Sequence, residues 1–446
     1  MMDNSNRGNS IFQSVSPVVL VLSLLVLIEL LALGRFSHQT DGLSLGASWW
    51  MEDYLTVSLV SLTIFVAIIS LVASDMDFGP DSNSSSFFVA VMLVSTMCVM
   101  TFVSSKAFFF FFFFESTLFP TLVLILGWGN QPERLQAGLQ MVVYTVCGSL
   151  PLLMVLGYVW TLFGSDSMVL LLLSKGNMIG EYMMIWFFLY LGMLVKVPVF
   201  GVHGWLPKAH VEAPLAGSML LAGVLLKLGI YGVCRMCAVV CVPDCSFIMG
   251  LASISLWGGV VCSFLCLCFY DVKSVIAYSS IAHMALSLMG VFSLSCLGWM
   301  GGICMALAHG VCSPCMFALA NYSYMVTGSR SIMLCKGMLK CLPLLTSMWF
   351  MFCVFNLGCP PSINFFSECF LFCSIFGYSS VMIIPLFLLC FLAAAYSLFI
   401  YSSINHGYQS CVLRSASGLS SRFLLIMVLS VILLFGMSLG MDMVFN

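Results

Sequence analysis

Charged residues are scarce in this chain of 446 residues: it has 15 Lys and Arg and 17 Asp and Glu, 7% in all. The net charge of −2 excludes nucleic acid as a natural partner, since phosphate binding needs a basic surface. Long polar stretches are also lacking, which leaves no room for a folded domain outside a membrane. Residues 1–15 form a polar tail with Arg7 as its one base, so neither a signal peptide nor an arginine-rich transit peptide is predicted. We therefore expect synthesis inside the organelle that uses the protein.

Apolar residues make up 62% of the chain and recur in runs of roughly 18 to 27 residues, the length that spans a bilayer. Only helices or closed barrels satisfy the backbone in lipid, and no strand-like alternation is present. The sequence predicts an all-α polytopic membrane protein, with residues 16–446 as a single transmembrane domain. We expect about thirteen transmembrane helices, at 16–34, 52–74, 86–103, 107–128, 138–164, 182–205, 214–240, 247–269, 274–294, 297–325, 341–378, 382–403 and 420–440.

Two of these segments contain a proline that should interrupt the helix. The first break is expected at Pro198, which removes the usual amide partner of the Leu194 carbonyl. The second is expected at Pro360-Pro361. Broken helices at matching places in two halves are typical of transporters built from inverted repeats, whose polar site lies at mid-membrane.

Titratable side chains lie inside six of the predicted segments. A charge in hydrocarbon costs about 3 kcal/mol or more, so each should face protein or trapped water. Burial favours the neutral form of a carboxylic acid or an amine, which makes proton exchange possible near neutral pH, and histidine already titrates there. The pattern indicates a proton relay formed by Glu115, Lys196, Lys227, His283, His309 and Glu368.

Structural roles for the same residues remain open. Glu115 and Lys196 could form a static ion pair that locks two helices, and His309 could donate an interhelical hydrogen bond. His283 could lie at the membrane interface, and Glu368 could cap the helix beyond the second break. Lys227 has no obvious local partner in the sequence. Three further candidates, His203, His210 and Glu212, fall in a predicted loop before residue 214. The 21 cysteines are scattered in apolar segments, where cysteine behaves as a small hydrophobe.

Several blocks of this sequence are similar to the subunit 4 family of mitochondrial proton-pumping NADH:ubiquinone oxidoreductase, complex I, which is related to bacterial antiporter-like subunits. The strongest block runs from Lys196 to Lys227 and includes Trp205-Leu-Pro-Lys-Ala-His-Val-Glu-Ala-Pro214 and residues 217–219. The Trp128-Gly-Asn-Gln motif and a glutamate at position 368 favour this family over the paralogous subunits 2 and 5. Further blocks lie at 114–120, 144–151, 271–280, 308–310 and 360–364.

The resemblance implies an antiporter-like fold and a role for each candidate residue. It implies that Glu115 and Lys196 are a coupled charge pair and that Lys227 is the central proton-storing lysine. His283 and His309 would be relay groups, and Glu368 the terminal acid. Because the family usually has fourteen helices, the first of them is expected to be missing here, replaced by the polar residues before Ser16.

The resemblance also implies where the protein works and what surrounds it. It predicts a multi-pass protein of the mitochondrial inner membrane that binds no cofactor itself, with NADH, FMN, iron–sulfur clusters and ubiquinone held by other subunits. Expected partners are the other membrane-arm subunits, above all the subunit 2 and subunit 5 paralogues, together with supernumerary subunits and lipids, cardiolipin among the candidates. Two other readings stay open: a free-standing cation/proton antiporter, and a membrane scaffold whose buried charges only lock helices.

Overall fold

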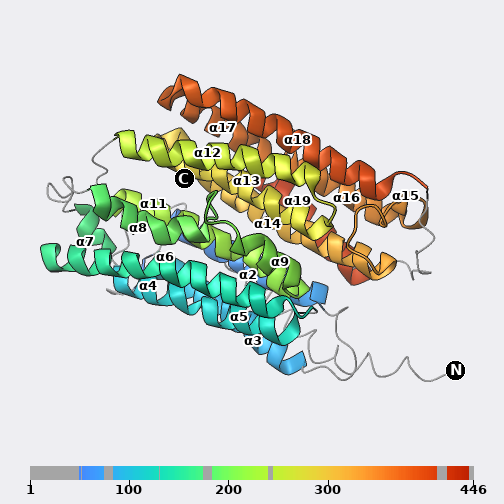
Figure 1. Ribbon diagram of the computed structural model, residues 1–446, viewed down its shortest axis with the longest axis horizontal. Helices are drawn as coiled ribbons and strands as arrows, with labels where there is room; N and C mark the ends of the chain where they lie inside the picture. Colours follow the sequence, from blue (N-terminus) through green and yellow to red (C-terminus); the bar gives the residue numbers. More distant parts are fainter. Residues whose placement is uncertain are drawn as a thin grey trace.

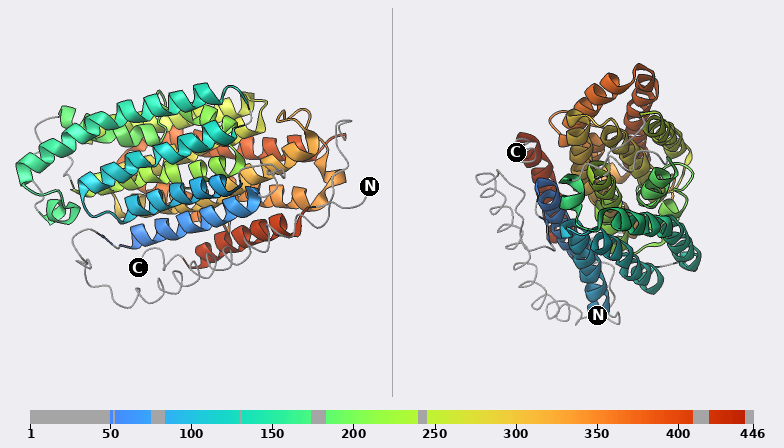
Figure 2. Two further views of the ribbon diagram at one scale, coloured as in Figure 1. Left: turned by 90° about the horizontal axis from the view of Figure 1, so that it is seen from below. Right: turned by 90° about the vertical axis from the view of Figure 1, so that its left-hand side faces the viewer.

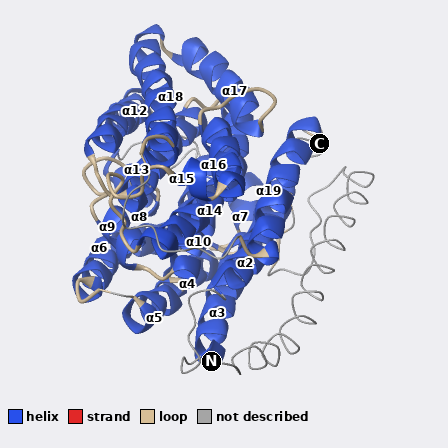
Figure 3. Cartoon of the chain, turned by 90° about the vertical axis from the view of Figure 1, so that its right-hand side faces the viewer, coloured by secondary structure: helices blue, strands red, loops and turns tan. Residues whose placement is uncertain are grey.

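The computed structural model describes residues 50–51, 53–74, 84–129, 131–173, 183–239, 245–408 and 419–440. The predicted segment 16–34 lies outside these residues. Within them the secondary structure is helical and no strand is present, as Figure 3 shows. Ten of the described helices are long and apolar enough to cross a membrane. The all-α membrane fold predicted from composition is therefore confirmed.

The helices follow one another along the chain with short connections. The first half contains α2 (Tyr54–Ser74), α3 (Ser84–Val103), α4 (Ala107–Ser116), α5 (Leu118–Trp128), α6 (Arg134–Phe163), α7 (Met168–Leu173), α8 (Met183–Lys196), α9 (Trp205–Glu212), α10 (Leu215–Leu220), the π-helical turn η1 (Leu221–Leu225) and α11 (Leu226–Val239). The second half contains α12 (Cys245–Cys268), α13 (Val272–Phe292), α14 (Cys296–Thr327), α15 (Met338–Cys341), α16 (Pro343–Asn356), α17 (Ile363–Tyr378), η2 (Ser380–Met382), α18 (Ile383–Asn405) and α19 (Ser421–Leu439).

The long helices run side by side along the long axis of Figure 1. Helices α4 and α5 lie near one edge of the bundle, and α17 and α18 lie at the opposite edge, which the end-on view of Figure 2 also shows. The spans formed by α10–α11, α13 and α14 are buried over 94–100% of their apolar windows, against 28% for α19. These three spans are thus the centre of the molecule, where polar groups are shielded from lipid.

The first broken helix consists of α8 and α9. Helix α8 ends at Lys196, and the Val199 amide donates to the Leu194 carbonyl at 3.2 Å, a six-residue closure that commonly ends helices. As predicted, Pro198 supplies no amide to this carbonyl, and the amide of the next residue takes its place. Trp205, at the start of α9, donates from Nε1 to the Val195 carbonyl at 3.1 Å. The break is thus held closed by one backbone bond and one side-chain bond.

The second broken helix consists of α16 and α17 and repeats this arrangement. Helix α16 ends at Asn356, and the Cys359 amide donates to the Val354 carbonyl at 3.2 Å. Asn364, at the start of α17, donates from Nδ2 to the Phe355 carbonyl at 2.6 Å. In Figure 1, α8 leads to α9 from left to right and α16 leads to α17 from right to left. Matching breaks that run in opposite directions are what inverted repeats predict.

At the first break the helix boundaries in the structure differ from the predicted ones. The predicted segment 182–205 ends as a helix at Lys196, and the expected loop that follows contains a second helical piece, α9. His210 and Glu212 therefore lie on a buried helix, with exposures of 0% and 5%, and not in a surface loop. The predicted segment 341–378 is likewise two helices, α16 and α17.

Candidate functional site

Lys227 lies at the centre of the bundle on α11, with its side chain fully buried. The π-helical turn η1 ends two residues before it, and such widened turns are frequent at functional sites. Lys227 Nζ donates to the Ala222 carbonyl of this turn at 2.6 Å and lies 3.0 Å from His309 Nδ1 of α14. An amine in contact with an imidazole can pass a proton to it directly.

Two histidines continue from this lysine towards the second half of the molecule. His309 of α14 and His283 of α13 are both buried, and their ring centroids lie 5.6 Å apart. His283 Nε2 lies 3.0 Å from the hydroxyl of Tyr396 on α18. Asn356, the last residue of α16, is also beside the His283 ring. His283 is therefore buried among helices α13, α14, α16 and α18.

Glu368 lies on α17, beyond the second break, and is partly buried. Its carboxylate rests against Gly358, where a Cβ atom would stand 2.6 Å from Oε2. Its charge acts on the Cys390 thiol and the Tyr396 hydroxyl, both on α18. The carboxylate therefore lies at the second break.

Lys196 is the corresponding group at the first break, where it is 4% exposed. Its ammonium donates to the Phe114 carbonyl and to Thr117 Oγ1, the latter at 3.3 Å, and lies 3.5 Å from the centre of the Phe114 ring. Glu115 acts on this ammonium electrostatically, and its Oε1 is buried without a hydrogen bond. Among the described residues no ion pair joins Glu115 to Lys196, so the two side chains are not in direct contact.

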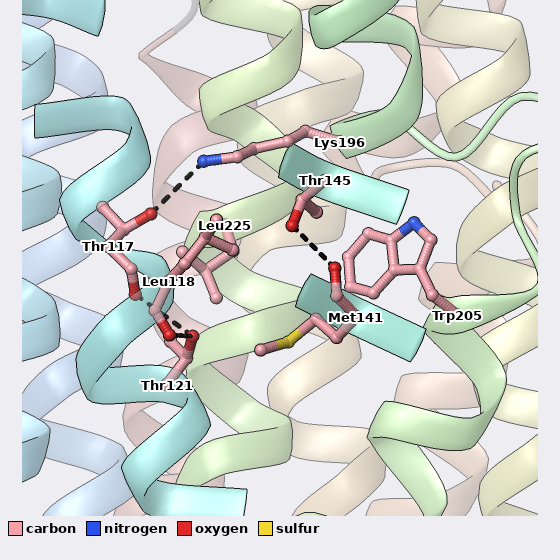
Figure 4. A pocket seen from close by; sticks show the side chains of 8 residues that line it. All are labelled: Thr117, Leu118, Thr121, Met141, Thr145, Lys196, Trp205 and Leu225. Atoms are coloured by element: carbon pink, nitrogen blue, oxygen red, sulfur yellow. Dashed lines mark hydrogen bonds between the residues drawn. The ribbon is translucent and has the colours of Figure 1, made fainter. Parts of the chain in front are cut away.

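A small cavity adjoins the Lys196 side chain, as Figure 4 shows. Its volume of about 20 Å³ is enough for one water molecule. Threonines contribute polar groups to its wall, and Leu225 of η1, two residues before Lys227, also lines it. The full lining is Thr117, Leu118, Thr121, Met141, Thr145, Lys196, Trp205 and Leu225. The space beside Lys196 can thus hold one water molecule.

Comparison with protein families places most of this site in one conserved module. Residues 104–393 match the model described as "NADH:quinone oxidoreductase/Mrp antiporter, TM". NADH-ubiquinone oxidoreductase chain 4 of Locusta migratoria is 40% identical over 400 residues, covering 90% of this chain and 89% of the relative. The same protein of Aedes aegypti is 46% identical over 319 residues, covering 70% of each chain.

This chain belongs to the NADH-ubiquinone oxidoreductase chain 4 family. Solved structures share the chain 4 fold at lower identity. Respiratory complex I from Thermus thermophilus contains a similar chain with a TM-score of 0.83 and 22% identity, covering 94% of this chain and 90% of that one. The Mrp complex from Dietzia sp. contains another with a TM-score of 0.82 and 16% identity, covering 96% and 90%. The antiporter-like fold is thereby confirmed.

The six candidate residues lie on six helices, α4, α8, α11, α13, α14 and α17. Lys227, His309 and His283 form one contiguous group in the centre. Lys196 lies at one end beside the cavity, and Glu368 lies at the other end beside the second break. Among the described residues, no group of three or more His, Cys, Asp or Glu side chains is arranged to hold a metal ion.

The sequence did not single out three side chains that contact this group. Tyr396 bonds to His283, Thr117 bonds to Lys196, and Asn356 occupies in the second break the position that Lys196 occupies in the first. Tyr396 stands within the apolar run Leu392-Ala-Ala-Ala-Tyr396. The sequence feature that could have identified Tyr396 is a ring with a hydroxyl group in the middle of an apolar segment.

His210 is near the same group, although the sequence placed it in a loop. Its ring stacks on Phe317 of α14 with centroids 4.8 Å apart, and neither ring nitrogen has a hydrogen-bond partner. Lys227 acts on it electrostatically. At the end of α9, Glu212 lies 4.0 Å from Arg330, which also donates to the Val211 carbonyl. Helix α9 is therefore anchored to the segment that follows α14.

Proposed function

We propose that this chain translocates protons in the membrane arm of mitochondrial respiratory complex I, through its buried line of titratable groups. Membership of the chain 4 family supports this role in the complex. The observation that carries the proposal is the contact of Lys227 with His309 at 3.0 Å, deep inside a membrane-spanning bundle. Ionisable groups buried in the interior of membrane proteins mark ion and proton paths.

The mechanism begins at Lys196, whose proton is held by a carbonyl, a hydroxyl and the nearby charge of Glu115. An electrostatic change driven by quinone reduction elsewhere in the complex weakens the influence of Glu115 on Lys196. Lys196 then releases its proton through the adjoining cavity towards Lys227. Lys227 passes a proton to His309, and from there it moves through His283 towards Glu368.

The energy required is within the range of such electrostatic changes. Moving one proton against a membrane potential costs about 2.3 kcal/mol per 100 mV. A tenfold change in proton affinity corresponds to about 1.4 kcal/mol. Coupled changes of a few powers of ten at Lys196, Lys227 and Glu368 therefore suffice to drive one proton across.

In this proposal the chain carries no redox group of its own. NADH oxidation and ubiquinone reduction take place in other subunits, which hold the FMN and the iron–sulfur clusters. The neighbours are membrane-arm subunits, expected to be the subunit 2 and subunit 5 paralogues and supernumerary subunits, with membrane lipids such as cardiolipin between them. The site of action is the mitochondrial inner membrane.

Replacing Lys227 with Met tests the proposal because Met keeps the length of the side chain and removes the proton. In complex I reconstituted into vesicles, Lys227→Met should abolish the proton transport that depends on this chain. NADH oxidation by artificial acceptors should be retained, since it does not use the membrane arm. The measurement is the number of protons taken up per NADH oxidised.

Lys340→Met is the matched control, because Lys340 on α15 is exposed and lies outside the buried line. This variant should pump as the unaltered complex does. Normal proton uptake per NADH in Lys227→Met would refute the relay.

A further inference from the structure

We propose that the Tyr396 hydroxyl carries the proton between His283 and Glu368, so that α18 contributes to the transfer path. This inference rests on the proposed function. It adds a tyrosine to the lysine, histidine and glutamate residues that the sequence singled out. Without it, the line of contacts stops at His283, in the centre of the bundle.

The contact with His283 places the hydroxyl at the end of the histidine pair. Tyr396 OH and His283 Nε2 lie 3.0 Å apart, and both side chains are almost completely buried, with exposures of 0% and 1%. His309, which contacts Lys227, also lies beside the His283 ring, as does Asn356. A proton that leaves Lys227 through the two rings therefore reaches the Tyr396 hydroxyl next.

Glu368 is the acid that would receive the proton from Tyr396. The charge of Glu368 acts on the Tyr396 hydroxyl and also on Cys390, six residues earlier on the same helix. Gly358, which lacks a side chain, leaves the space in which the Glu368 carboxylate lies. Since no hydrogen bond in the described structure joins Tyr396 directly to Glu368, the last step needs a bridging water.

The position of Tyr396 in the fold supports a transfer role. The span that follows the first broken helix, α10–α11, carries Lys227, which bonds to His309. The span that follows the second broken helix, α18, carries Tyr396, which bonds to His283. Each half of the molecule thus presents one proton-bearing side chain to the central histidine pair, and the two contacts have the same length of 3.0 Å.

The transfer balances without a charged phenolate. The N–H bond at His283 Nε2 breaks as an O–H bond forms on Tyr396, while the original Tyr396 O–H proton passes to the bridging water. That water gives a proton to the Glu368 carboxylate, which becomes neutral. Tyr396 ends with one proton, as it began, and rotation of its hydroxyl resets the path.

Tyr396→Phe in the complex reconstituted into vesicles tests the inference, because it removes the hydroxyl and keeps the ring that packs between helices. Loss of one acid–base group slows proton transfer by about 100-fold or more. Proton uptake per NADH should therefore fall by the share that this chain contributes. Tyr401→Phe on the same helix is the matched control, since the Tyr401 ring packs against Phe350 and His406 at 5.3 and 5.5 Å and should tolerate the change.

A second variant, Tyr396→His, distinguishes a proton-transfer role of Tyr396 from a purely structural one. Tyr396→His restores a group that can accept and donate a proton, so the transfer role predicts partial recovery of proton uptake relative to Tyr396→Phe. If Tyr396→Phe does not assemble, the comparison is made between Tyr396→His and Tyr396→Met. Equal pumping by these two would overturn the inference.

The outcome also separates this inference from the proposed function. If Lys227→Met abolishes pumping and Tyr396→Phe pumps normally, the path bypasses Tyr396 and the inference fails alone. If Lys227→Met pumps normally, the proposed function fails first, and the inference fails with it.

Discussion

Two lysines in this chain are buried to a similar degree but have different partners. Lys227 contacts an imidazole, which can accept its proton. Lys196 contacts a backbone carbonyl, which cannot, together with a threonine hydroxyl. In the proposed relay, Lys196 therefore holds a proton until its surroundings change, whereas Lys227 passes a proton on to His309. The nearby carboxylate that could produce such a change is Glu115.

Glu115→Gln should therefore impair pumping although the residue does not contact Lys196 directly. The amide keeps the size of the carboxyl group and removes the charge that acts on the ammonium. We expect proton uptake per NADH to fall by this chain's share, with artificial-acceptor activity unchanged. Glu133→Gln, at an exposed position before α6, is the control and should have no effect.

The double variant Glu115→Gln with Lys196→Met distinguishes the relay from a scaffold. A scaffold whose buried charges only lock helices predicts that this neutral pair of matching size leaves turnover and pumping intact. The relay predicts an assembled complex that pumps less. Unchanged proton uptake per NADH in the double variant would favour the scaffold.

The sequence predicted which residues are buried and titratable, but not how they pair. Lysine, histidine and glutamate in apolar segments are recognisable because their burial is costly. The contact of Lys196 with the Phe114 carbonyl depends on how α8 packs against α4, which no local pattern encodes. Tyr396 was missed for a similar reason, because a buried tyrosine becomes significant through its partner, His283, on another helix.

The two helix breaks are the elements that position Lys196 and Glu368. Each break ends the first half-helix at a polar residue, Lys196 or Asn356, and is closed by a side chain from the second half. In the second break Gly358 has a φ of +77°, a conformation that costs about 1–2 kcal/mol for a residue with a Cβ. This glycine also borders the Glu368 carboxylate.

Gly358→Ala should therefore disturb both the break and the acid beside it. The new Cβ would stand 2.6 Å from Glu368 Oε2 and 2.9 Å from its Cδ, so the carboxylate must move. We expect lower proton uptake per NADH and faster thermal inactivation of the complex. Both are measured on reconstituted vesicles before and after heating.

Gly377→Ala on α17 is the matched control, because a Cβ there meets nothing within 4 Å. An alanine within a helix is more stable than glycine by about 0.5–1 kcal/mol, so this variant should keep its activity and its heat stability. Equal behaviour of the two alanine variants would contradict the role assigned to Gly358.

The sequence located both breaks through their prolines but did not predict α9. The eight residues Trp205–Glu212 are too few and too polar to register as a membrane segment, and hydropathy alone describes them as a loop. They are helical and buried because Trp205 anchors them to α8 and the His210 ring stacks on α14. Such tertiary contacts override local propensity.

Across the whole molecule, the titratable groups extend sideways through the bundle. They lead from α4 at one edge, through the fully packed central helices, to α17 and α18 at the other (Figure 1). In the proposed relay, charge therefore moves mainly from one edge of the bundle to the other, across the long axes of the helices. This direction suits a subunit that transmits an electrostatic change to neighbours on both sides.

The chemistry of the central groups also predicts which ion the molecule moves. Sodium binding requires several oxygen ligands, whereas Lys227, His309 and His283 present nitrogen atoms and repel a cation when protonated. Proton uptake per NADH by the reconstituted complex should therefore stay the same when choline replaces sodium in the medium. Vesicles that contain the isolated chain should likewise move no protons in response to a sodium gradient. Sodium-driven proton movement by the isolated chain would instead identify a cation/proton antiporter. It would also place the coupling ion outside the lysine–histidine group.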